Sequence, residues 1–243
     1  MPKYKLCAFD LDGTLVNTIA DIAYAANHAL EELGYPPCEE DSYRYKVGNG
    51  MRMICKRALP EEVQENEEIL QEMIRRYDAY YSAHCCDRSR AYPGIPELIR
   101  DLRQAGVKLA VISNKPHAQS LIVLKTLFGY QEPDPAKDSL QSEAKAPSGE
   151  REEFFYVQGQ SERFARKPDP EALLDCIAQA GVPKEECIYV GDSDVDVEFA
   201  RRAGLSCIGA AWGFRGRGEL EEAGAAYIAE KTEDIYRYAA GPI

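Results

Sequence analysis

Short apolar runs alternate along the chain with stretches in which apolar residues recur at helical spacing. The apolar runs, which we predict to be strands, cover residues 4–8, 108–113, 154–157, 187–191 and 206–210. The helical stretches cover residues 95–105, 118–128, 170–180 and 195–203. Three of these helical stretches are followed by a glycine, which is a common helix end: Gly106, Gly181 and Gly204. This alternation predicts an α/β fold, a Rossmann-like parallel sheet with helices on both faces.

The segment between the first two predicted strands is far longer than a crossover between parallel strands requires. It begins with an apolar helical repeat that starts at Ile19 and closes at Gly34. Pro60 suits the first turn of a second long helix, which we expect to reach about His84. We therefore predict an inserted helical cap subdomain over residues 18–87 and a catalytic core formed by residues 1–17 and 88–243.

Residues 131–151 differ from the rest of the chain. They contain three prolines and many charges, with Leu140 as the one large aliphatic residue. Such a composition predicts a flexible surface loop. The loop precedes a strand, whereas the active site of an open parallel sheet lies at the carboxyl ends of the strands. We expect the loop to play no part in the chemistry.

Composition narrows the class of protein. The chain of 243 residues is 45% hydrophobic, and its formal net charge is -12. This charge argues against a nucleic-acid or anionic-membrane partner. No apolar run approaches the roughly 20 residues of a membrane helix, and the first residues do not form a signal peptide. We expect a cytoplasmic protein, a monomer or a homodimer, whose eight cysteines are free thiols.

Polar side chains follow several of the predicted strands. Asp10 and Asp12 end the first strand, and the sequence Ser113-Asn114-Lys115 ends the second. Asp192 and Asp196 follow the fourth strand, and Lys167 lies before the helix that follows the third. The carboxyl ends of parallel strands meet at one edge of the sheet, so these groups converge on one crevice.

Clustered carboxylates at such an edge repel one another unless a cation offsets their charge. Asp10 and Asp12 occupy positions i and i+2 of an extended segment, so both can face the crevice. Carboxylate oxygens are hard ligands of the kind that Mg²⁺ prefers. A lysine and a Ser/Asn pair suit the oxygens of a phosphoryl group, and Gly13 permits close approach of the backbone to an anion. The sequence predicts a magnesium site beside a phosphoryl site.

Four segments of the chain closely resemble the motifs of the haloacid dehalogenase superfamily. The first is FDLDGTL at residues 9–15, and the second is ISN at residues 112–114. The third is KPDP at residues 167–170, and the fourth is GDSDVD at residues 191–196. Each motif alone is compatible with a turn, a loop or a helix cap. Together they occur in the order and at the spacing of the family, and the resemblance covers nearly the whole chain.

The predicted cap resembles that of the phosphoglycolate phosphatase-like subgroup. The similarity extends to the cap loop at residues 47–50, to Tyr92-Pro93-Gly94 as a return linker, and to Trp212-Gly213-Phe214 after the fifth strand. In the cap loop, Gly48 and Gly50 either end a helix or face the substrate, and the sequence leaves both interpretations open.

The resemblance implies a role for each motif residue. Asp10 would be the nucleophile that forms an aspartyl phosphate, and Asp12 the general acid and base. Ser113 and Lys167 would complete the catalytic set by holding the phosphoryl oxygens. Gly13, Thr14, Asn114, Gly48 and Gly50 are the expected substrate-binding residues. The expected Mg²⁺ ligands are Asp10, the Asp12 carbonyl and Asp192, with Asp196 acting behind them or through water.

The predicted function is therefore Mg²⁺-dependent hydrolysis of a small phosphate monoester, with phosphoglycolate as the example that the subgroup suggests. A sugar phosphomutase or a pyrophosphatase on the same fold is the alternative. Mutase relatives carry a histidine a little after the first motif, where this chain has none between Asn17 and Ile22. Dehalogenases lack the second aspartate that Asp12 supplies. A binding protein without activity is a third possibility, which intact motifs disfavour. The cap residues that would select the substrate cannot be placed from the sequence.

Overall fold

The computed structural model describes residues 2–132 and 154–241, so most of the loop predicted at 131–151 lies outside the described residues. The strands are β1 (Leu6–Phe9), β2 (Val16–Asn17), β3 (Arg90–Ala91), β4 (Lys108–Pro116), β5 (Tyr156–Gln160), β6 (Cys187–Gly191), β7 (Ser206–Ala210) and β8 (Tyr227–Ala229). The α-helices are α1 (Ile19–Glu32), α2 (Met51–Ala58), α3 (Glu67–His84), α4 (Ile95–Gln104), α5 (His117–Phe128), α7 (Glu171–Ala180), α8 (Asp194–Ala203), α9 (Gly216–Ala223) and α10 (Thr232–Ala240). The same described ranges contain the short 3₁₀ helices η1 (Glu40–Tyr45), η2 (Glu61–Val63) and η3 (Lys184–Glu186).

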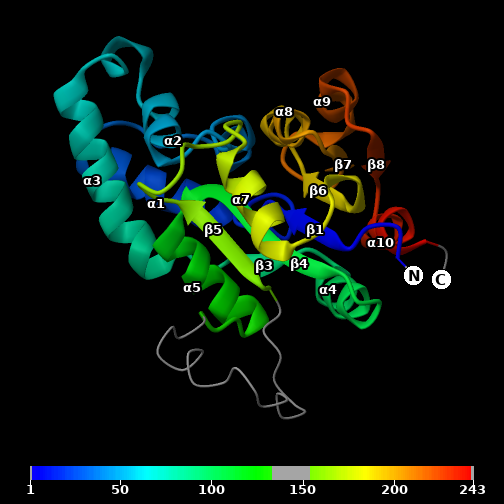
Figure 1. Cartoon of the computed structure of the whole chain (residues 1–243). Helices are drawn as coiled ribbons and strands as arrows, with labels where there is room; N and C mark the ends of the chain where they lie inside the picture. Colours follow the sequence, from blue (N-terminus) through cyan, green and yellow to red (C-terminus); the bar gives the residue numbers. More distant parts are fainter. Residues whose placement is uncertain (1, 133–153, 242–243) are drawn as a thin grey trace.

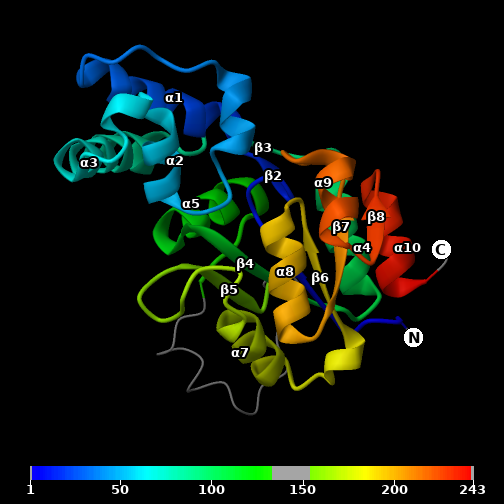
Figure 2. The same cartoon turned by 90° about the horizontal axis from the view of Figure 1, so that it is seen from above.

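The described residues form a six-stranded parallel sheet in the order β5-β4-β1-β6-β7-β8 (Figure 1). Side chains alternate between the two faces of the sheet, as the period of a strand requires. In β1, Leu6 and Ala8 pack with α7 and α8, whereas Cys7 and Phe9 pack with α4 and α10. Figure 2 shows helices of the core on both sides of the sheet, with α1, α2 and α3 grouped apart from them. The predicted α/β Rossmann-like fold is confirmed.

The helical elements between β2 and β3, which we call the cap, lie at one end of the molecule, and the arrowhead of β5 points toward them (Figure 1). They comprise α1, η1, α2, η2 and α3. The chain enters and leaves the cap through β2 and β3, which pair antiparallel, with Val16 opposite Ala91. Asp21 in α1 also joins the two linkers, because its carboxylate accepts hydrogen bonds from the backbone N–H groups of Arg88 and Ser89 at 2.8–3.1 Å. The division of the chain into a core and a cap domain at residues 18–87 stays a prediction.

Several predicted elements need correction. The third strand begins two residues later than predicted, and β4 extends three residues beyond Ser113. The short strands β2, β3 and β8 were not predicted, because two or three residues are too few to show a period. Pro60 does not open the long cap helix. It precedes η2, and α3 begins after Asn66, whose side chain caps the backbone N–H groups of Glu68 and Ile69.

All eight cysteines are free thiols, as expected, and most of them are buried. None of the helices in the described stretches combines the length and the apolar composition needed to cross a membrane.

Candidate active site

A tight turn follows β1 and carries the first two carboxylates. The N–H of Asp10 continues the sheet by donating to the carbonyl of Val190 at 2.9 Å. The next residues fold back, so that the carbonyl of Leu11 accepts from both Leu15 and Val16 at 3.0 Å. Gly13 has a φ of 88°, and a Cβ atom there would lie 2.3 Å from Oδ2 of Asp192. Only glycine fits both the left-handed backbone and this close approach.

Gly13→Ala should therefore destabilise the protein more than an alanine placed in the same backbone conformation elsewhere. Gly204 is the matched control, because its φ is 82° but no atom lies near its missing Cβ. Gly204→Ala should lower the free energy of unfolding by about 1 kcal/mol from backbone strain alone. Gly13→Ala should lower it by roughly 1–3 kcal/mol more, because the Asp192 side chain must move. Urea unfolding measures both, and equal losses would mean that the turn and Asp192 are not packed as described.

The turn after β6 supplies the other two carboxylates, which are buried at 3% exposure for Asp192 and 1% for Asp196. Oδ2 of Asp196 accepts from the Ser193 hydroxyl at 2.7 Å and from the backbone N–H groups of Asp192 and Ser193 at 3.2 Å. This capping box begins α8. Oδ2 of Asp192 accepts from the N–H of Phe214 at 2.7 Å, and its Oδ1 accepts from the Thr14 hydroxyl at 3.3 Å. Because Asp192 and Asp196 are buried, residues 191–196 are not simply the solvent-exposed, acidic N-terminus of a helix.

Lys167 lies between the two turns. Its Nζ is 2.9 Å from Oδ1 of Asp10, 2.7 Å from Oδ1 of Asp196 and 3.0 Å from the hydroxyl of Tyr189. Burial by itself lowers the pKa of Lys167. The two carboxylates raise this pKa by more than burial lowers it, so the net shift is upward and Lys167 stays charged. One lysine thus offsets part of the charge of two carboxylates.

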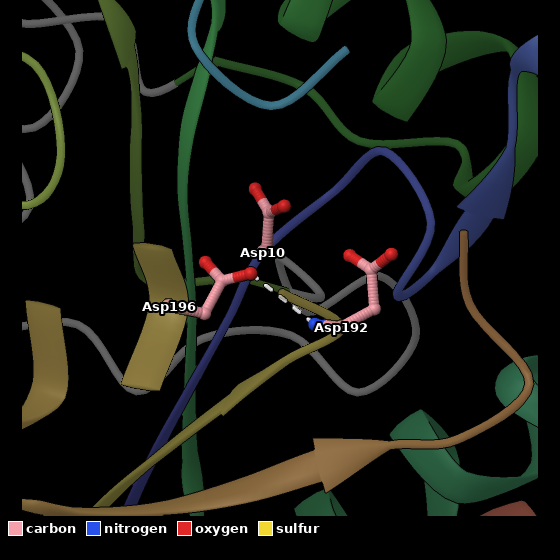
Figure 3. Close-up of side chains that lie close together, drawn as sticks. All are labelled: Asp10, Asp192 and Asp196. Atoms are coloured by element: carbon pink, nitrogen blue, oxygen red, sulfur yellow. Dashed lines mark hydrogen bonds between the residues drawn. The ribbon is translucent and has the colours of Figure 1, made fainter. Parts of the chain in front are cut away.

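Asp10, Asp192 and Asp196 form a cluster in which one carboxylate oxygen of each lies within 4.8 Å of the others (Figure 3). Burial, followed by nearby carboxylates, raises the pKa of Asp192 well above its usual range. Burial likewise raises the pKa of Asp10 to about 6, against the opposing effect of Lys167. Apart from its ion pair with Nζ of Lys167 at 2.9 Å, the buried Oδ1 of Asp10 has no partner among the described residues. Three buried carboxylates beside one lysine provide hard oxygen donors and excess negative charge, which fit a divalent cation such as Mg²⁺.

The end of β4 supplies a second set of groups. The hydroxyl oxygen of Ser113 accepts from the N–H of Lys115 at 3.3 Å. The side chain of Asn114 binds the backbone of Lys167, accepting from its N–H at 2.8 Å and donating to its carbonyl at 3.1 Å. The same amide donates to the carbonyl of Gly48 in the cap at 3.0 Å. Asn114 therefore fixes Lys167 and the cap loop in place, while its expected contact with substrate stays a prediction.

Lys115 is a site residue that the sequence did not single out. Its Nζ lies 3.0 and 3.2 Å from the two carboxylate oxygens of Asp12, and it also contacts the hydroxyl of Tyr81 in the cap. The hydroxyl of Thr18 donates to Asp12 at 2.9 Å. Lys115 stands two residues after Ser113 on a strand, and this spacing, which places both side chains on one face, is the signal that could have found it.

The cap loop lies over the crevice. Its carbonyls at Val47, Gly48 and Asn49 accept one hydrogen bond each, at 3.0–3.1 Å, from Arg215, Asn114 and Arg166. Gly50 has a φ of 82° and immediately precedes α2. Gly48 and Gly50 therefore lie at the beginning of a helix rather than at the end of one, and both line the cavity described next.

One cavity, with a volume of about 50 Å³, brings most of the predicted residues together. From the core it is lined by Asp10, Asp12, Ser113, Asn114, Lys115, Lys167, Asp192 and Arg215. From the cap it is lined by Ile22, Val47, Gly48, Gly50, Met51, Ile54, Tyr77 and Tyr81. The other predicted residues lie next to Asp192. Gly13 packs against its side chain, Thr14 donates a hydrogen bond to it, and the carboxylate of Asp196 accepts from its backbone N–H.

Comparisons with known proteins agree with this geometry. The family model for haloacid dehalogenase-like hydrolases matches residues 4–204. A phosphoglycolate phosphatase of Pseudomonas putida is 32% identical over 86% of this chain and 70% of its own length. One of Mannheimia succiniciproducens is 30% identical over 97% of this chain and 98% of its own. The crystal structure of a proposed phosphoglycolate phosphatase from Lactobacillus delbrueckii superposes with a TM-score of 0.84 at 29% identity, covering 99% of this chain and 100% of that one.

Proposed function

The chain belongs to the haloacid dehalogenase-like hydrolase family, and from this premise we propose that it is a Mg²⁺-dependent phosphatase for a small phosphate monoester such as 2-phosphoglycolate. One observation carries the proposal. Two aspartates from a single turn lie in the same cavity, but each is held by a different lysine, Asp10 by Lys167 and Asp12 by Lys115. Two carboxylates in separate surroundings can take two separate chemical roles.

In the first step, a carboxylate oxygen of Asp10 attacks phosphorus, and the ester P–O bond breaks. Asp12 gives a proton to the leaving oxygen, so that the alcohol departs neutral. In the second step, Asp12 takes a proton from a water molecule that attacks the phosphorus of the aspartyl phosphate. The P–O bond to Asp10 breaks, and inorganic phosphate is released. Each carboxylate returns to its starting state.

The remaining groups stabilise charge on the transferring phosphoryl group. Ser113 and Lys167 both line the cavity near Asp10, where they can contact phosphoryl oxygens. Mg²⁺ bound by Asp10, the Asp12 carbonyl and Asp192 would offset the negative charge of the carboxylates and the phosphate. Asp196 uses its oxygens on Lys167 and on the turn after β6, which supports an indirect role for it.

The residues after the first motif bear on the alternative functions. Mutase relatives carry a histidine there, whereas this chain has none between Asn17 and Ile22. This difference favours a phosphatase over a sugar phosphomutase. A screen of phosphate monoesters with detection of released phosphate tests the substrate class, and the inclusion of inorganic pyrophosphate in the screen tests for a pyrophosphatase. A cytoplasmic location and the oligomeric state stay predictions.

Removal of the metal should abolish turnover. Excess EDTA is expected to reduce phosphate release from 2-phosphoglycolate to the background rate, because the clustered carboxylates then repel an incoming dianion. Added Mg²⁺ should restore the rate fully, whereas an equal ionic strength of NaCl should not. Full activity in metal-free buffer would contradict the proposed mechanism.

A further inference from the structure

Two tyrosines of the cap face the cavity with hydroxyl protons that have no acceptor. Tyr77 and Tyr81 lie one turn apart on α3, are 2% and 3% exposed, and stack with ring centroids 5.2 Å apart. Within the described residues, the hydroxyl of Tyr77 makes no hydrogen bond. Burial raises the pKa of both hydroxyls well above the usual range, so each retains its proton. Both tyrosines line the cavity, so an acceptor atom of a bound ligand can take these protons.

The only hydrogen-bond partner of the Tyr81 hydroxyl in the described part of the chain is Lys115. A lysine ammonium can only donate, so the tyrosine oxygen accepts and its own proton remains free. Lys115 contacts both oxygens of Asp12, and one of these contacts can be exchanged for an oxygen of a ligand. The two tyrosines and the lysine thus offer two neutral donors and one positive charge at the same wall of the cavity.

Lys115 and the two tyrosines lie close to Asp12, the residue that would protonate the leaving oxygen. In the proposed reaction, the leaving oxygen binds the carboxyl group of Asp12. Nζ of Lys115 is 3.0 Å from that carboxyl group, so the leaving oxygen and Nζ cannot be more than about 6 Å apart. A carboxylate on the carbon that bears the ester oxygen spans this distance. Ile22, Met51 and Ile54 of the cap also line the cavity, and their side chains offer an anion no hydrogen bond.

We propose that Lys115, Tyr77 and Tyr81 form a subsite that binds a carboxylate of the leaving group, and that these residues select phosphate esters of short 2-hydroxy acids over neutral esters. The inference rests on the proposed phosphatase function and adds to it the residues that determine specificity. Because the lysine belongs to the core and the tyrosines to the cap, the subsite is complete only when the cap is seated.

Arg215 is the competing cation. It also lines the cavity, but its guanidinium donates to the carbonyl of Val47 at 3.1 Å and lies 3.7 Å from the carboxylate of Glu219. Arg215 thus shares its charge with Glu219, as Lys115 shares its charge with Asp12, but Arg215 does not contact the proposed general acid. An Arg215→Gln variant tests this alternative directly, since the two assignments predict loss of selectivity in different variants.

The test measures binding in a protein that cannot turn over. The Asp10→Asn protein with Mg²⁺ is titrated by calorimetry with 2-phosphoglycolate and with ethyl phosphate, which lacks the carboxylate. We expect a preference for the acid of tenfold or more, and a loss of about tenfold in that preference on adding Lys115→Met, Tyr77→Phe or Tyr81→Phe. The affinity for ethyl phosphate should change little in the two tyrosine variants, whereas Lys115→Met also removes a partner of Asp12, so for this variant the ratio of the two affinities is compared. Tyr80→Phe is the matched control on α3, because Tyr80 stacks between His28 and His84 outside the cavity and should leave the preference unchanged.

Three outcomes would overturn the subsite: no preference for the acid in the starting protein, equal losses for both esters, or loss of the preference with Arg215→Gln but not with Lys115→Met. Equal losses would mean that Lys115 and Tyr81 only position Asp12. If Lys115→Met does not fold, the two tyrosine variants still decide. Failure of the proposed function would appear differently, as the absence of Mg²⁺-dependent phosphate release from every monoester by the protein with Asp10 intact.

Discussion

Replacing Asp10 with asparagine is expected to reduce phosphate release by roughly 10⁴-fold or more, because the amide cannot form the bond to phosphorus. The loss should be the same for every phosphate ester, since no leaving group can replace the missing nucleophile. Steady-state rates with 2-phosphoglycolate and with p-nitrophenyl phosphate measure it. The fold should be retained, because asparagine has nearly the same size and Lys167 keeps its contact with Asp196.

Asp194→Asn is the matched control for this variant. Asp194 is an exposed aspartate at the start of α8, close in sequence to Asp192 and Asp196, but it does not line the cavity. Its replacement should leave the rate close to that of the natural protein. If Asp10→Asn retained activity comparable to that of the Asp194→Asn control, Asp10 would not be the nucleophile.

Replacing Asp12 with asparagine should have an effect that depends on the leaving group. The loss of a general acid and base lowers a rate by about 10²–10⁴-fold. An alkyl phosphate needs its leaving oxygen protonated, so with 2-phosphoglycolate the first step should stall. p-Nitrophenyl phosphate releases a stabilised phenolate and needs little help, so with this ester only the second step should stall. Stopped-flow absorbance should then show a burst of p-nitrophenol followed by slow turnover.

A different result would assign Asp12 a different role. Near-normal turnover of either ester by Asp12→Asn would mean that Asp12 is not the general acid and base. A folded variant that binds Mg²⁺ but shows no burst would indicate that Asp12 mainly positions the site. The second case is a real alternative, because Asp12 is held by Lys115 and Thr18 on the same side as the cap.

The core of the site could be predicted because it depends on local rules. The i, i+2 spacing of Asp10 and Asp12, and the position of Lys167 and Asp192 after parallel strands, follow from strand geometry and from the common edge of the sheet. The distances agree, since Lys167 lies 2.9 Å from Asp10 although the two residues are far apart in the sequence.

The cap side of the site could not be predicted in the same way. Tyr77 and Tyr81 occupy a helical repeat that the sequence shows only as a buried face. Which buried positions face the cavity rather than other cap helices depends on how α3 docks on the core, and no local pattern encodes that. In the sequence, nothing distinguishes Lys115 from the other polar residues that follow strands. Its contacts with Asp12 and Tyr81 in the structure place it between the core and the cap.

The central claim is that the phosphoryl group passes through Asp10, and mass spectrometry of a quenched reaction tests it most directly. The Asp12→Asn protein is mixed with p-nitrophenyl phosphate and Mg²⁺, quenched in acid during the slow phase and digested. The account predicts a phosphate on the peptide that contains Asp10, and none when Asp10→Asn is also present. A p-nitrophenol burst with the phosphate on a different residue, or with no residue phosphorylated, would contradict it.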